Sequence, residues 1–155
     1  MTEKLRAFLG KTALVTGAGD GIGAMLARQL AEAGLSVLVQ DIRAEAAERV
    51  AREIGDRARP LVFDVSDVEA VNTAASALEA QGATLNLLWI NAGVASDQAI
   101  LSASANEVSW AYGVNVLGAV WTAHAFAPFL MRADGPRHVG LTASVAALRL
   151  PGEAY

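Results

Sequence analysis

The sequence contains no cysteine. Disulfide frameworks, thiolate metal sites and cysteine nucleophiles are therefore excluded, and this composition favours a cytoplasmic protein. The sequence has no run of eighteen apolar residues, which is the length needed to span a bilayer. Its apolar stretch at residues 7–9 is too short for the core of a signal peptide. We therefore expect neither a membrane partner nor an export signal.

Charge is also scarce, because charged residues make up 18% of the 155 residues and the net charge is −4. Binding to nucleic acid requires a cluster of Lys and Arg that neutralises phosphates, and the sequence has none, so we expect no nucleic-acid partner. The hydrophobic share of 54% argues against disorder. The length suits a single domain that covers residues 1–155.

Strand-like and helix-like segments alternate along the chain. Short apolar runs predict five strands, at residues 12–16, 36–40, 60–63, 85–90 and 138–142. Segments with helical periodicity predict four helices, at residues 22–33, 44–54, 68–80 and 107–131. Because the strands are almost continuously apolar, we expect both faces of the sheet to be covered.

This alternation predicts an α/β fold with a doubly wound parallel sheet in the strand order 3-2-1-4-5. Sheets of this kind usually continue into a further helix and a sixth strand. We therefore expect the fold in this sequence to be truncated after the fifth strand.

A glycine-rich turn, Thr16-Gly17-Ala18-Gly19-Asp20-Gly21-Ile22-Gly23, follows the first predicted strand. Its spacing is T-G-x-x-x-G-x-G and differs from the general dinucleotide pattern G-x-G-x-x-G. Glycines at this place let the backbone approach a pyrophosphate, whose charge is met by free amides and by the N-terminus of the next helix. The turn predicts a dinucleotide site, with a purely structural tight turn as the alternative.

Asp41 ends the second predicted strand, 18 residues after Gly23. A carboxylate at this place accepts hydrogen bonds from the ribose hydroxyls, worth about 1.5–3 kcal/mol, and repels a 2′-phosphate. NAD is therefore predicted over NADP, and Asp20 in the turn adds a second negative charge. Arg43 opposes this preference because it could reach a phosphate. The alternative for Asp41 is a strand-end or helix-cap residue.

Further motifs follow in order: Asp64-Val65, Asn91-Ala92-Gly93, Val114-Asn115-Val116-Leu117-Gly118, Thr142-Ala143-Ser144 and Tyr155. Together with the glycine turn they make the chain, from Lys11 to Tyr155, resemble the short-chain dehydrogenase/reductase family. The resemblance implies a Rossmann fold and a homo-oligomer. It also implies an NAD-dependent oxidoreductase that transfers hydride between the nicotinamide and a secondary alcohol or ketone.

The resemblance implies that Asp64 and Val65 flank the adenine and that residues 91–93 form a wall beside the cofactor. Without it, Asp64 would be a loop cap and residues 91–93 a turn. The predicted cofactor-binding residues are Thr16, Gly17, Gly19, Asp20, Gly21, Ile22, Gly23, Asp41, Ile42, Asp64, Val65, Asn91, Ala92 and Gly93.

Three catalytic residues follow from the same resemblance. The Ser144 hydroxyl would hold the reacting oxygen, and the Tyr155 phenol would donate or remove its proton. A phenol pKa near 10 makes a poor base, so the family lowers it with a nearby lysine and the positive nicotinamide ring. Asn115 would hold a water in the proton relay, with a satisfied core amide as the alternative.

Two departures from the family pattern affect these predictions. Ser144 and Tyr155 are 11 residues apart, which is closer than usual and leaves Thr142 as a weaker candidate for the serine role. The lysine expected one helical turn beyond Tyr155 is not in the sequence, so we expect weak cofactor binding and slow turnover. An inactive dinucleotide-binding or interaction module is therefore a second hypothesis. A methyltransferase with the same strand-glycine-helix element is a third, which the later motifs disfavour.

No metal is predicted, because neither His124 nor His138 has partners at metal-ligand spacing. The tryptophans Trp89, Trp110 and Trp121 are expected to be packing residues. Trp121 and Phe126 lie on a predicted helix that family members often use for dimer contacts.

Overall fold

The computed structural model describes residues 6–95 and 102–144, so the predicted catalytic Tyr155 lies outside the described residues. Five strands form one parallel sheet in the order β3-β2-β1-β4-β5, as predicted. The strands are β1 (Thr12–Val15), β2 (Ser36–Asp41), β3 (Ala58–Val62), β4 (Leu87–Ile90) and β5 (His138–Leu141). Most strand ends differ from the predicted ones by one or two residues, and the others coincide.

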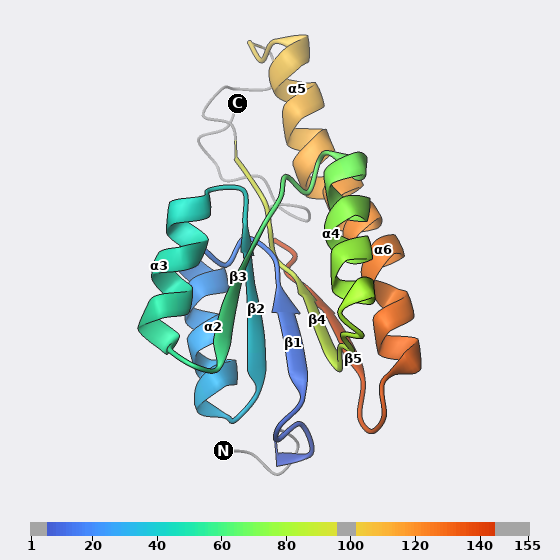
Figure 1. Cartoon of the computed structure of the whole chain (residues 1–155). Coiled ribbons are helices and arrows are strands. Elements are labelled where there is room, and N and C mark those ends of the chain that lie inside the picture. Colours follow the sequence, from blue (N-terminus) through green and yellow to red (C-terminus); the bar gives the residue numbers. More distant parts are fainter. Residues whose placement is uncertain (1–5, 96–101, 145–155) are drawn as a thin grey trace.

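Helices cover the sheet on both sides (Figure 1). Helices α2 (Gly21–Glu32) and α3 (Ala44–Ile54) lie on one face, and α4 (Val68–Ala80) lies on the other with α6 (Gly118–Arg132). The predicted helix at 107–131 is instead three consecutive segments, α5 (Ala105–Tyr112), the π-helical turn η1 (Gly113–Leu117) and α6. The predicted doubly wound α/β architecture is therefore confirmed, with three layers.

Two hydrophobic clusters, one on each side of the sheet, form the core. In β1, Val15 packs in the cluster with α2 and α3, and its neighbour Leu14 packs in the cluster with α4 and α6. Successive side chains of a strand point to opposite faces, so a central strand that is buried on both sides must be apolar throughout. This explains the uninterrupted apolar run from which the strand was predicted.

Helices cover both faces of the sheet, as predicted, but the two edge strands are only partly covered. In β5, Val139 is 50% exposed and Leu141 is 61% exposed, and in β3 Val62 is 47% exposed. Gly140 is buried. The Trp89 ring on β4 lies so close to it that a Cβ at this position would overlap the ring. Each edge strand pairs with only one described neighbour, so short apolar runs also mark half-covered strands.

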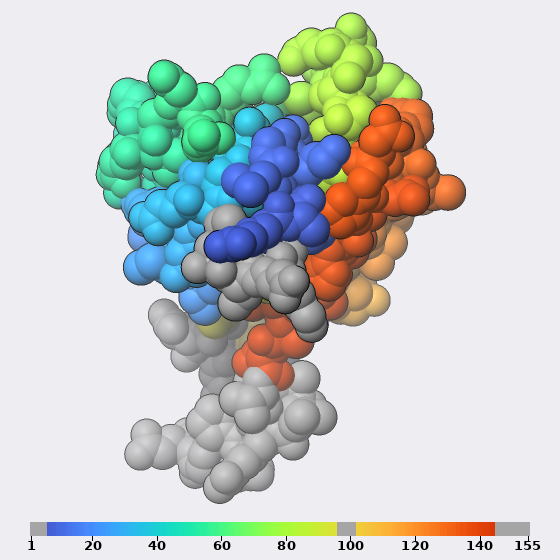
Figure 2. All heavy atoms as spheres, turned by 90° about the horizontal axis from the view of Figure 1, so that it is seen from below, coloured from blue at the N-terminus to red at the C-terminus, as the bar shows by residue number. Residues whose placement is uncertain are grey.

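The face at the N-terminal ends of the strands is closed by packing (Figure 2). The blue residues that follow the N-terminus lie there between the α2–α3 side and the α6–β5 side of the molecule. Lys11 reaches the turn before β5, where its Cε lies 3.3 Å from the Cβ position of Gly135. The opposite end of the sheet, at the carboxyl ends of the strands, is where the structure is hollowed.

Among the described residues one helical run, Ala105–Arg132, is long and apolar enough to cross a membrane by length and composition alone. Core helices of other proteins pass the same test, so this is weak evidence. In this structure α6 packs on β4 and α4, and Phe126 on α6 is fully buried. The absence of a membrane segment stays a prediction from the sequence.

Candidate functional site

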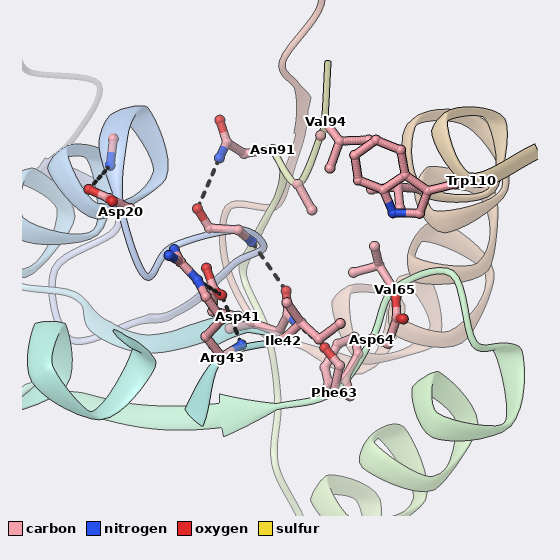
Figure 3. Close-up of a pocket in the computed structure, with 16 residues that line it drawn as sticks. Asp20, Asp41, Ile42, Arg43, Phe63, Asp64, Val65, Asn91, Val94 and Trp110 are labelled. Carbon is pink, nitrogen blue, oxygen red and sulfur yellow. Dashed lines mark hydrogen bonds and ion pairs between the residues drawn. The ribbon is translucent and has the colours of Figure 1, made fainter. Parts of the chain in front are cut away.

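A cavity of about 490 Å³ opens at the carboxyl ends of β1, β2, β3 and β4 (Figure 3). Parallel strands end at the same edge of a sheet, which brings together loops that are far apart in the sequence. Many predicted cofactor-binding residues line this cavity: Gly17, Asp20, Gly21, Asp41, Ile42, Asp64, Val65, Asn91, Ala92 and Gly93.

The other predicted cofactor-binding residues lie around the cavity rather than in its lining. Thr16, Gly19 and Gly23 are buried. Ile22 is 71% exposed and lines a second, apolar depression of about 690 Å³ between α2 and the ends of β4 and β5. Gly21 borders both hollows, so the N-terminus of α2 lies between them.

The glycine turn requires glycine for two physical reasons. Gly17 and Gly21 have φ values of +61° and +52°, in the left-handed region that residues with a Cβ rarely adopt. Gly23 is needed for packing, because a Cβ there would overlap the Gly17 carbonyl oxygen and lie 2.6 Å from Nδ2 of Asn91. No atom lies within 4 Å of a Cβ built at Gly21, so this part of the turn is open.

Strand β2 accepts three consecutive backbone N–H groups of the turn. The Gly17 N–H donates to Oε1 of Gln40 at 3.2 Å, and the Ala18 N–H donates to the Gln40 carbonyl at 2.7 Å. The Gly19 N–H donates to Oδ2 of Asp41 at 3.0 Å. The donors that face an incoming anion are therefore those of the first turn of α2, whose N–H groups have no partner within the helix.

Asp41 is 6% exposed, and three hydrogen bonds fix its carboxylate. Besides the bond from Gly19, Oδ1 accepts from the Arg43 backbone N–H at 3.0 Å and from the Arg43 Nε at 3.3 Å. Arg49 on α3 donates to the Gly19 carbonyl at 2.8 Å, so both backbone groups of Gly19 are held by side chains. Asp41 does not cap α3, because the cap residue is Arg43.

Asp20 is the N-cap of α2 and is exposed, with its Oδ1 accepting the Gly21 N–H at 2.8 Å. A carboxylate is favourable at the positive end of a helix dipole. The same charge opposes a second anion at that helix end, so Asp20 weakens any phosphate site here.

Asp64 and Val65 follow β3 and form the wall across from the turn. Oδ1 of Asp64 accepts from the Ser66 N–H at 2.8 Å and from the Ser66 hydroxyl at 2.7 Å. Val65 is 6% exposed and packs on Gly118, where a Cβ would lie 2.8 Å from Cγ2 of Val65. These contacts fix both residues at the cavity.

Asn91 connects three strand ends. Its Nδ2 donates to the carbonyls of Thr16 and Gly17 at 3.1 and 3.3 Å, and its Oδ1 accepts from the Thr142 hydroxyl at 3.0 Å. The buried Thr16 hydroxyl accepts from the N–H groups of Asn91 and Ala92 at 2.9 and 3.1 Å. These two side chains therefore tie the loop after β4 to the glycine turn.

Asn115 lies in the π-helical turn η1, and its side chain is exposed, not buried in the core. Its Oδ1 accepts from the Val94 N–H at 2.8 Å, and its Nδ2 donates to the Val94 carbonyl at 2.9 Å. The amide therefore pairs with the backbone of the loop after β4. Turns of π-helix are frequent at functional sites.

Ser144, a predicted catalytic residue, lies beyond the end of β5 and is exposed. Thr142, the weaker candidate, donates to Asn91 and accepts from Nε1 of Trp89 at 3.0 Å, so its hydroxyl has a bonding role in the fold. No group of three or more metal-ligating side chains occurs within residues 6–95 and 102–144.

Six residues of the lining are not among the predicted cofactor-binding residues: Gln40, Arg43, Phe63, Val94, Trp110 and Val114. Gln40 was detectable, because a polar residue inside an apolar strand needs a buried partner. Trp110 lies four residues before Val114, another lining residue, and this helical spacing could have placed both on one face. No sequence signal identifies Val94.

A family model described as short chain dehydrogenase matches residues 11–153. Estradiol 17-beta-dehydrogenase 11 of Mus musculus is 31% identical over 147 residues, which cover 93% of this chain and 49% of that protein. The chain thus spans about half the length of the curated relatives it matches.

Solved structures agree with this match. A short chain dehydrogenase/reductase from Burkholderia phymatum, in complex with NAD, has a TM-score of 0.85 and 36% identity, covering 94% of this chain and 53% of that one. A 3-ketoacyl-(acyl-carrier-protein) reductase from Brucella melitensis, complexed with NADH, has a TM-score of 0.85 and 31% identity, covering 90% and 60%.

Proposed function

Because this chain belongs to the short-chain dehydrogenase family, we propose that it is the NAD-binding domain of an oxidoreductase acting on a secondary alcohol or ketone. The observation that carries the proposal is the fixed Asp41 carboxylate at the rim of a cavity that begins at an open glycine turn. The related proteins crystallised with NAD and NADH support the choice of cofactor.

The residues present fit a dinucleotide. Open space at Gly21 and the N-terminus of α2, whose first N–H groups have no partner within the helix, suit a pyrophosphate, and the Asp41 carboxylate suits ribose hydroxyls. Asp64 and Val65 would hold the adenine, and residues 91–93 would form the adjoining wall. The negative charges of Asp41 and Asp20 disfavour a 2′-phosphate, so NAD is proposed over NADP.

Bound NAD supplies the hydride acceptor, and the chain's own residues arrange the substrate around it. The Ser144 hydroxyl holds the reacting oxygen in place, and the Tyr155 phenol oxygen takes up or releases its proton. Asn115 keeps the loop after β4 in position through Val94. Thr142, bonded to Asn91 and Trp89, is the weaker candidate for the serine role.

Activity measurements test this proposal. NAD⁺ reduction is followed at 340 nm with a panel of secondary alcohols, for the full-length protein and for Tyr155→Phe. We expect the variant to lose about 10²- to 10⁴-fold in kcat/KM while its affinity for NADH is unchanged. NADH binding without activity on any alcohol or ketone would instead favour the inactive module, which the dehydrogenase relatives do not support.

The same proposal covers the protein's surroundings. We place it in the cytoplasm and expect a homo-oligomer with a small-molecule substrate, without nucleic acid, metal or membrane. The absence of cysteine and of a basic cluster supports this placement.

A further inference from the structure

We propose that Trp110 is a binding residue for the adenine base, and this inference rests on the proposed function. The sequence suggested that Trp110 is a packing residue, but α5 has no buried residue at all. Trp110 is 49% exposed and lines the cavity. Figure 3 shows its indole across the cavity from Asp20, near Val65 and Val94.

The strand order indicates which half of a dinucleotide Trp110 would meet. The order is β3-β2-β1-β4-β5, so Asp41 and Val65, which follow β2 and β3, lie on one side of the glycine turn. Ser144 follows β5 on the other side. Since Asp41 receives the ribose of the adenosine half, the base must continue toward the end of β3, where Val65 and Trp110 form the apolar wall.

The chemistry of this wall suits a flat heteroaromatic ring better than a sugar or a phosphate. Val65, Val94 and Val114 contribute aliphatic surface to the lining that Trp110 shares. Of the charged side chains, Asp20, Asp41 and Arg43 lie on the opposite side, and Asp64 lies beside Val65. An indole face stacks on any purine, and the stacking removes apolar area of both rings from water. Half of the Trp110 surface is available for this, which explains an exposed tryptophan at this place.

Helix α5 holds Trp110 in position through its N-terminal cap. The Ser104 hydroxyl accepts the Glu107 N–H at 3.2 Å, and Oε2 of Glu107 accepts the Ser104 N–H at 2.8 Å. This reciprocal capping box orders the turn just before Trp110. The indole is therefore presented by a regular helix.

The test uses Trp110→Ala, Trp110→Phe and the control Tyr112→Ala in the full-length protein. Tyr112 is an aromatic residue of the same helix, 56% exposed, and does not line the cavity. Affinities for AMP and for NADH are measured by isothermal titration. We expect Trp110→Ala to raise both Kd values by about tenfold. The Kd values of Trp110→Phe should stay within about threefold of the wild-type values, and those of Tyr112→Ala should equal the wild-type values.

A purely structural role would lower the thermal stability of Trp110→Ala without a selective loss of AMP binding. The inference is overturned if Trp110→Ala binds AMP as well as Tyr112→Ala does, or if it weakens NADH binding alone. Either result leaves the proposed function intact provided that the wild type binds NADH. A wild type that binds neither AMP nor NADH would overturn both proposals.

Discussion

At the scale of single residues, Gln40 and Asp41 at the end of β2 determine how the glycine turn meets a ligand. They accept the N–H groups of Gly17, Ala18 and Gly19. Only the first turn of α2 then remains to bind an anion. The part of the turn at residues 17–19 is thus held by β2, and the N–H groups that can bind an anion lie at its end, in the first turn of α2.

Asp41→Asn tests the role of the negative charge of the Asp41 carboxylate at the rim of the cavity. The amide retains an oxygen for the Gly19 N–H but loses the negative charge that favours ribose hydroxyls and repels a 2′-phosphate. Charged hydrogen bonds are worth about 1 kcal/mol more than neutral ones. We therefore expect the ratio of NADH to NADPH affinity to fall about tenfold, measured by titration with both. Asp56→Asn, outside the cavity lining, is the control, and an unchanged ratio in Asp41→Asn would contradict the assignment.

Gln40→Leu tests the buried amide. Gln40 is 1% exposed, accepts from the Gly17 N–H and donates from Nε2 to the Phe63 carbonyl at 2.6 Å. Leucine leaves both backbone groups without a partner, which costs about 2–4 kcal/mol of unfolding free energy in total. Urea unfolding measures this loss, and exposed Gln29→Leu on α2 should change stability by less than about 0.5 kcal/mol. Equal stabilities for Gln40→Leu and Gln29→Leu would show that the two hydrogen bonds of Gln40 do not stabilise the fold.

At the scale of elements, the helical run after the loop of β4 shows how a local irregularity serves the site. A continuous helix was predicted at 107–131, but η1 widens it at Gly113–Leu117. Within this turn Asn115 pairs with Val94, and the next residue after the turn, Gly118, packs closely on Val65. The helical period of the sequence does not reveal such a turn, because the apolar pattern continues through it.

The N-terminus of α5 should be sensitive to acid. Hydrogen bonds from the Ser104 backbone and hydroxyl lower the pKa of Glu107 below its ordinary value. A lowered pKa in the folded state adds stability that is present above roughly pH 4.3 and is lost as the pH falls through the folded value. Amide exchange in α5 should therefore be slower in the wild type than in Glu107→Gln near neutral pH, and equal in acid. A difference that persists below pH 3 would contradict this.

At the scale of the whole molecule, the order of strands and helices could be predicted because each central strand is apolar throughout and each helix shows one apolar face. The exposure of the edge strands could not be predicted, because β5 is as apolar as a covered strand. The site was predicted at the ends of β1 to β4 from motifs such as residues 16–23. The polar Gln40 in an apolar strand and the helical spacing of Trp110 and Val114 gave signals for two further lining residues, whereas Val94 had none.

Apolar side chains on η1 and α6 suggest where copies of the chain meet. Phe126 is fully buried and Trp121 packs on the core, so they are not the contact surface, whereas Val116 and Val120 are 41% and 51% exposed. We expect sedimentation equilibrium at micromolar concentration to give a homo-oligomer and Val120→Glu to shift it toward monomer. Val139→Glu, on the exposed edge strand β5, should leave the mass unchanged. A monomeric wild type would refute the assembly.

The cavity at the carboxyl ends of the strands is proposed to bind NAD and to reject the 2′-phosphate of NADP. The most direct test is a calorimetric titration of the full-length wild type with NADH and with NADPH under identical conditions. We expect one site for NADH, with a Kd at least about tenfold below that of NADPH. Equal or tighter binding of NADPH would contradict it.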